Sequence, residues 1–102
     1  MLFDKVKLAL RASGTAFDAE ITDLIEAAIA DLRRVGIIVT EIQEEGSPVD
    51  VGDPLLIRAI ILYAKAESGF YDADDAERYR NAYDHLQCAL SLSEDYIESE
   101  GG

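Results

Sequence analysis

Two groups of side chains in the C-terminal half are of types that could do chemistry. His85 and Cys88 are three residues apart, so on a helix they would share a face, where an imidazole could activate a thiol as a nucleophile. Such a pair also needs a third group to orient the base and a turn that offers an oxyanion hole, and the sequence supplies neither. We therefore favour a histidine on the helix surface and a small, half-buried cysteine.

The second group is the acidic run Asp72-Ala73-Asp74-Asp75, whose carboxylates are the hard oxygen ligands that Mg²⁺ and Ca²⁺ prefer. No glycine stands at the offset that a calcium loop needs, and no bidentate glutamate completes one. Acids are also stabilising at the positively polarised N-terminus of a helix. We therefore favour helix capping over a cation site.

No other pattern supports catalysis. A nucleophile elbow, a phosphate-binding glycine loop and an HExxH motif are all missing, and one cysteine with one histidine cannot build an ordinary Cys/His zinc site. The sequence predicts no catalytic residue, no metal and no cofactor, so we do not expect an enzyme.

The elements that would position these residues are predicted to be helices, which makes the fold class all-α. Helical spacing of apolar residues predicts four helices, at residues 3–12, 18–35, 54–68 and 72–92. Asp18 is the expected N-cap of the second, and Asp53-Pro54 is a strong start signal for the third. The third helix is apolar almost all round, so it is expected at the centre of the core.

Residues 37–53 have a different character, because short apolar alternations flank a turn-like stretch. Ile37 and Val39 are compatible with a short strand or extended arm, and Val49 and Val51 with a return strand. We predict a long acidic loop or short hairpin here. The single helical domain is expected to span residues 1–93, followed by an acidic, flexible tail at 94–102.

Composition restricts the class of protein further. The chain has 102 residues, 49% of them hydrophobic, and a net charge of −12 with a pI near 4.2. That charge argues against adhesion to nucleic-acid phosphates or anionic membranes. One cysteine is typical of a reduced compartment, and neither a signal peptide nor a membrane span is expected.

Aromatic residues concentrate in the second half of the chain. Tyr79 and Tyr83 are expected to pack between helices. Phe70 and Tyr71 lie between two predicted helices, where a ring could instead contact a partner.

Two stretches carry a family resemblance. DPLLIRAIILYAKAESG at 53–69 and AERYRNAYDHLQCALSLS at 76–93 resemble the small head–tail connector proteins of tailed bacteriophages, a family also described as DNA-packaging or head-completion proteins. The resemblance implies a small helical subunit of a homo-oligomeric ring, expected to be dodecameric to match a portal. The ring would stack on the portal protein in the virion neck, after assembly in the host cytoplasm. A tail or stopper protein would attach below it, and the genome would pass through its channel.

Contacts in such a ring would use exposed apolar side chains outside the helix stripes. The candidate interface residues are Ile37, Val39, Ile42, Phe70, Tyr71, Tyr96 and Ile97.

The acids of the loop could face the channel and repel DNA, or simply keep the domain in solution. The candidate channel-facing acids are Glu41, Glu44, Glu45 and Asp50. An alternative function is that of an acidic interaction module, a DNA mimic that inhibits a basic protein.

Overall fold

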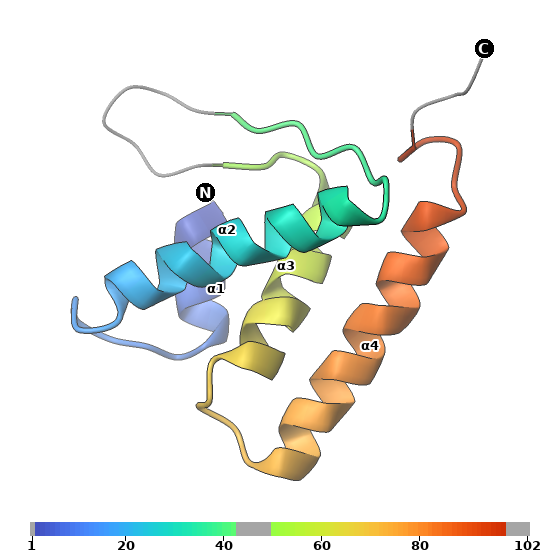
Figure 1. Cartoon of the computed structure of the whole chain (residues 1–102). Coiled ribbons are helices and arrows are strands. Elements are labelled where there is room, and N and C mark those ends of the chain that lie inside the picture. The colour runs from blue at the N-terminus through green and yellow to red at the C-terminus, as the bar shows by residue number, and fades with distance from the viewer. Residues whose placement is uncertain (1, 43–49, 98–102) are drawn as a thin grey trace.

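The computed structural model describes residues 2–42 and 50–97 and contains four helices in that part of the chain (Figure 1). The helices are α1 (Leu2–Ala9), α2 (Asp18–Arg34), α3 (Pro54–Glu67) and α4 (Ala73–Ser91). The predicted all-α class is confirmed, with every helix boundary within three residues of its expected position. The largest difference is at the end of α1. Arg11 has a positive φ of 57°, and a right-handed helix cannot continue through that backbone conformation.

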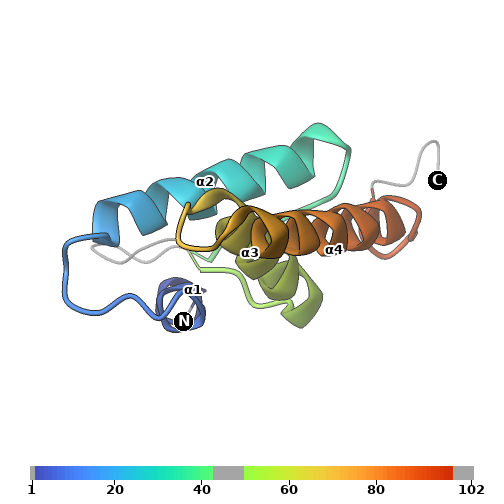
Figure 2. The same cartoon turned by 90° about the horizontal axis from the view of Figure 1, so that it is seen from below.

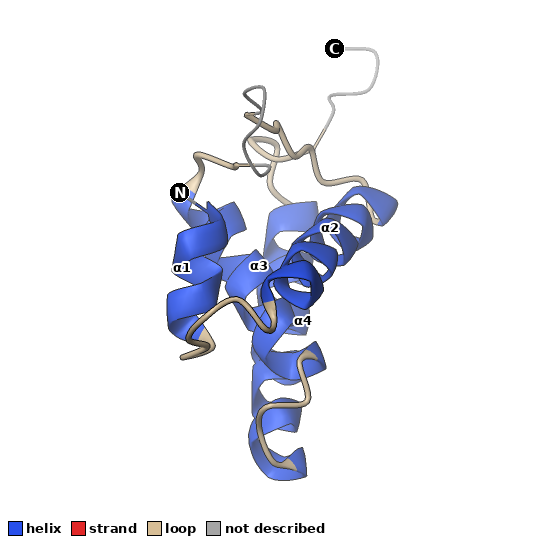
Figure 3. Ribbon diagram, turned by 90° about the vertical axis from the view of Figure 1, so that its left-hand side faces the viewer, coloured by secondary structure: helices blue, strands red, loops and turns tan. Residues whose placement is uncertain are grey.

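Helix α3 is the centre of the core, as its composition predicts. It packs against α1, α2 and α4, and the views from two sides show it between the other helices (Figures 1 and 3). One side of α3 is buried in the core, and the opposite side carries exposed Arg58. The residues of α3 that are buried are Leu56, Ala59, Ile60 and Ala64.

Two of the helix starts are capped by an aspartate side chain. Backbone N–H groups of Leu55 and Leu56 donate to Asp53 Oδ1 over 2.8 and 3.3 Å, and the N–H of Asp75 donates to Asp72 Oδ1 over 2.8 Å. The capping interpretation of the Asp72 run is therefore confirmed.

The predicted N-cap of α2 is wrong. Phe17 holds that position without a side-chain cap, and Asp18 is the first helical residue. The Asp18 carboxylate instead lies 2.8 Å from Lys7 Nζ, so it links α2 to α1. Sequence alone does not distinguish a cap from an ion pair made across the fold.

The segment after α2 does not form regular strands within the described residues. Ile42 and Asp50 form a single antiparallel bridge, in which each N–H donates to the other's carbonyl oxygen over 2.7 and 2.9 Å. Of the expected return strand, Val51 is buried in non-strand backbone, and Val49 lies outside the described residues.

The tail docks on the start of this segment. Ile37 and Ile97 form an antiparallel bridge, and the N–H of Ile38 donates to the carbonyl oxygen of Tyr96 over 2.7 Å. Tyr96 and Ile97, which belong to the tail expected at residues 94–102, therefore pack on the helical domain.

A polar cluster connects α2 and α4. The Tyr83 hydroxyl and the Gln87 amide donate to Asp31 Oδ2 over 2.7 and 2.8 Å, while Arg34 pairs with Oδ1 of the same carboxylate at 3.0 Å. Burial acts to raise the pKa of Asp31, but the hydrogen bonds from Tyr83, Arg34 and Gln87, with the charge of Arg34, outweigh it. The pKa of Asp31 is therefore lowered from its ordinary value of 3.8.

This shift makes a prediction about stability and pH. A carboxyl group with a lowered folded-state pKa contributes stability above its unfolded pKa, and that stability is lost as pH falls through the folded pKa. Asp31→Asn should therefore lower the free energy of unfolding by about 1 kcal/mol at pH 7 and by much less near pH 2. Urea denaturation at both pH values measures this, with Asp84→Asn on the exposed side of α4 as control. A deficit that is equal at both pH values would contradict the assignment.

The domain is a thin slab. Its principal extents are 47 × 38 × 18 Å, and the view along the slab shows α2 on one broad side and α1 with α3 on the other (Figure 2). None of the four helices combines the length and apolarity that crossing a bilayer requires, within the described part of the chain.

Candidate functional site

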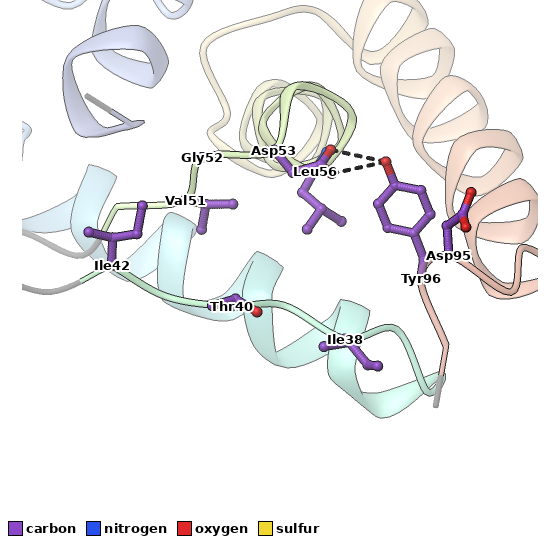
Figure 4. A pocket seen from close by; sticks show the side chains of 9 residues that line it. All are labelled: Ile38, Thr40, Ile42, Val51, Gly52, Asp53, Leu56, Asp95 and Tyr96. Carbon is purple, nitrogen blue, oxygen red and sulfur yellow. Dashed lines mark hydrogen bonds between the residues drawn. The ribbon is translucent and has the colours of Figure 1, made fainter. Parts of the chain in front are cut away.

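A groove lies where the segment after α2 meets the start of α3 and the tail (Figure 4). It encloses about 330 Å³, and we call it the arm–tail groove. Two neighbouring segments, at 38–42 and 51–56, and the distant tail form its walls. The lining residues are Ile38, Thr40, Ile42, Val51, Gly52, Asp53, Leu56, Asp95 and Tyr96.

Tyr96 forms part of one wall of the arm–tail groove and is fixed in place by hydrogen bonds. Its hydroxyl donates to Asp53 Oδ1 and Oδ2 at 3.1 and 3.0 Å, drawn as dashed lines in Figure 4. Burial, this hydrogen bond and the negative charge of Asp53 raise the pKa of the Tyr96 hydroxyl. Asp53 thus caps α3 and anchors the tail with the same carboxylate.

The groove has a mixed surface. Ile38 and Ile42 are each 48% exposed on one wall, and the carboxylates of Asp53 and Asp95 lie at its tail end. Such a site suits an apolar side chain from a partner segment, with hydrogen-bond donors placed near the carboxylates. Exposed apolar side chains that line a groove make it a candidate contact site.

The structure brings together some of the predicted interface residues. Ile42 and Tyr96 line the groove, and Ile97 is half-buried beside it through the bridge to Ile37. These residues come from segments more than fifty positions apart, so only the tertiary fold makes them neighbours.

The expectation that Ile37 and Val39 are exposed is wrong. They are 2% and 5% exposed and belong to the main hydrophobic core. Because side chains alternate along an extended segment, burying these two turns Ile38 outward. Ile38 is the exposed residue that was not among the candidates. It could have been found from the sequence, because in an extended segment the side chain between two buried neighbours points to the opposite side.

Glu41 and Asp50 are the candidate channel-facing acids that the structure describes, and both have partners within the fold. Arg33 lies 3.5 Å from Glu41, which remains exposed. The N–H groups of Leu2 and Val51 donate to Asp50 Oδ1 over 2.8 and 2.9 Å, so this carboxylate anchors the start of α1. Glu44 and Glu45 lie outside the described residues.

Phe70 and Tyr71 lie away from the groove, in the connection between α3 and α4. Phe70 packs edge-on against Phe17 with ring centroids 5.0 Å apart. The Tyr71 hydroxyl donates to the carbonyl oxygen of Ala9 over 3.2 Å, and its ring packs edge-on against Tyr79. Phe70 remains partly exposed, whereas Tyr71 mainly holds α1 to the α3–α4 connection.

His85 is exposed on α4, as expected, whereas Cys88 is exposed and not half-buried. Across residues 2–42 and 50–97, no three side chains of His, Cys, Asp or Glu come together in a group that could hold a metal ion.

Residues 2–97 match the family model described as "Phage connector protein". The match includes all four helices, the arm–tail groove and the part of the tail that docks on it. No curated protein and no solved structure matches the chain.

Proposed function

The chain belongs to the phage connector protein family, and from this premise we propose that it is one subunit of a ring that joins the phage head to its tail. In this proposal the ring stacks on the portal, holds a tail or stopper protein on its other face, and lets the genome pass through its channel. The observation that carries the proposal is the family match over residues 2–97.

The shape of the domain supports an assembling role. A slab 18 Å thick exposes more surface for its volume than a sphere, so its broad sides offer area for contacts with other subunits. Copies that contact each other through unlike surfaces form a closed ring when the rotation between them permits it. We propose a ring with the symmetry of the portal, expected to be twelvefold.

The arm–tail groove is our candidate for the contact with a neighbouring neck protein. It is concave and partly apolar, and the exposed side chains of Ile38 and Ile42 stand on one wall. A partner segment that covers them would remove apolar surface from water, which is the main driving force for association.

We further propose that the protein acts by assembly and catalyses no reaction. Of the acids proposed to face the channel, Glu41 remains the described candidate, since Asp50 is occupied by the backbone of α1. A chain of net charge −12 would let DNA slide past without binding, because carboxylates and phosphates repel each other.

Electron microscopy of the purified full chain, alone and mixed with its portal, tests this function. We expect rings of uniform size, or rings that form only on the portal. A chain that stays monomeric, ignores the portal and binds a basic protein in a salt-sensitive way would contradict the proposal and favour the acidic interaction module.

Binding of the next neck protein to the purified ring tests the groove. Ile38→Asp places a charge on an exposed position of the groove wall, so the domain should still fold while the neck contact weakens about tenfold or more. Leu92→Asp, at an exposed position after the end of α4, is the matched control. Equal binding of the next neck protein by both variants would exclude the groove as its site.

A further inference from the structure

Only some of the basic side chains in the described residues form ion pairs. The chain has nine lysines and arginines, all of them in the described part. Five form ion pairs: Lys7, Arg33, Arg34, Arg78 and Arg80. In residues 2–42 and 50–97, the cations without an ion pair are Lys5, Arg11, Arg58 and Lys65.

Three of these four cations lie on one surface. Two hollows of about 590 and 400 Å³ adjoin each other and share Lys65 and Tyr79. Arg11 lines the first hollow and Arg58 the second, and no acidic residue lines either. We call this surface, on the outer side of α1, α3 and the start of α4, the basic face.

The basic face also has the composition of a protein–protein contact. The Lys65 ammonium lies 5.0 Å from the centroid of the Tyr79 ring, which in turn packs against Tyr71. Leu8 is 78% exposed beside them, and arginine and tyrosine are the residue types enriched at interface hot spots. Cations among aromatic and aliphatic side chains fit a partner that is itself acidic.

The opposite broad side of the slab is formed by α2 and has the complementary charge (Figure 2). Glu20, Asp23 and Glu26 are exposed there, and none of them forms an ion pair with a described residue. The two arginines at the end of α2 are paired with Asp31 and Glu41. We call this outer side of α2 the acidic face.

We propose that the basic face of one copy binds the acidic face of α2 on a second copy. This contact is head to tail, because it joins unlike surfaces on opposite sides of the same slab. The broad side measures 47 × 38 Å, which leaves room for the roughly 800 Å² that each partner buries in a standard interface. The inference rests on the proposed ring function and specifies its subunit contact.

Zero-length carbodiimide coupling tests the contact directly. The full chain is mixed with its ¹⁵N-labelled form, both alone and together with its portal, and is then coupled and analysed by mass spectrometry. Lys65 and Glu26 of one copy lie on opposite sides of the slab, so a coupled pair between them must join two copies. We expect mixed-isotope peptides that link Lys65 to Asp23 or Glu26. Their absence would overturn the proposal.

Charge reversal is the second test. Arg58→Glu with Lys65→Glu, or Asp23→Lys with Glu26→Lys, should each reduce association about tenfold or more, and the four changes together should restore it. Lys5→Glu, at an exposed cation outside the two hollows, is the matched control. Arg11→Gly should weaken association and keep the fold, because glycine suits the positive φ at this position. Circular dichroism checks the fold of each variant.

The outcomes separate the two proposals. Rings that survive reversal of Arg58 and Lys65, or a fourfold variant that does not reassociate, would overturn this contact and leave the connector function standing. Lys65–Glu26 coupling in a protein that forms no ring, alone or on the portal, would support the contact and contradict the ring.

Discussion

Replacing Ile60 with alanine should lower the free energy of unfolding by about 3 kcal/mol. Ile60 is fully buried in the middle of α3, the helix that packs against the other three. The change removes three carbons and leaves a cavity that the surrounding helices fill only in part. For a domain of this length, the melting temperature should fall by roughly 12–24 °C.

Thermal and urea denaturation measure this loss, and Leu55→Ala is the matched control. Leu55 stands on the same helix but is 44% exposed, so its truncation should change the free energy of unfolding by about 0.5 kcal/mol. A similar loss at both positions would contradict the placement of α3 at the centre of the core.

Replacing Asp53 with alanine should lower the free energy of unfolding by about 2–3 kcal/mol. Loss of an N-cap costs about 1 kcal/mol, and loss of a hydrogen bond to a charged group about 1.5 kcal/mol more. Asp53 makes both interactions, since it caps α3 and accepts from the hydroxyl of Tyr96. Its removal should also free the tail, which limited proteolysis near Tyr96 would detect.

Asp72→Ala is the control for the cap alone. Asp72 caps α4, and in the described part of the chain its side chain accepts a hydrogen bond only from the N–H of Asp75. We expect a loss of about 1 kcal/mol there. In a double-mutant cycle, Tyr96→Phe should cost much less in an Asp53→Ala background than in the natural chain. Additive effects would exclude the contact between the tail and α3.

Local features of the sequence were sufficient for most of the secondary structure. Helix α2 was predicted to within one residue, because its apolar spacing and the glycine at position 36 act within a few turns of chain. The start of α3 followed from Asp53-Pro54 for the same reason. The failures involve residues whose partners are distant, such as Asp18, whose carboxylate pairs with Lys7 on another helix.

The candidate site was only partly predictable. In an extended segment, Ile37 and Val39 point to one side and Ile38 to the other. Because all three are apolar, the sequence does not tell which side another element will cover. The element that pairs with this segment is the tail, about sixty residues later in the chain. Sequence reasoning therefore selected Ile37 and Val39 for the interface and missed Ile38.

By itself, the sequence determined the four helices, two of their aspartate caps, the net charge of −12 and the resemblance to phage connectors that the family match confirms. These properties depend on short-range hydrogen bonding, periodicity and composition, all of which can be read along the chain. Only the tertiary structure decided which cations lack an ion pair, which isoleucine of the arm is exposed, and how the tail closes the groove. Those properties depend on contacts between helices and loops distant in sequence, which exist only once the core around α3 has packed.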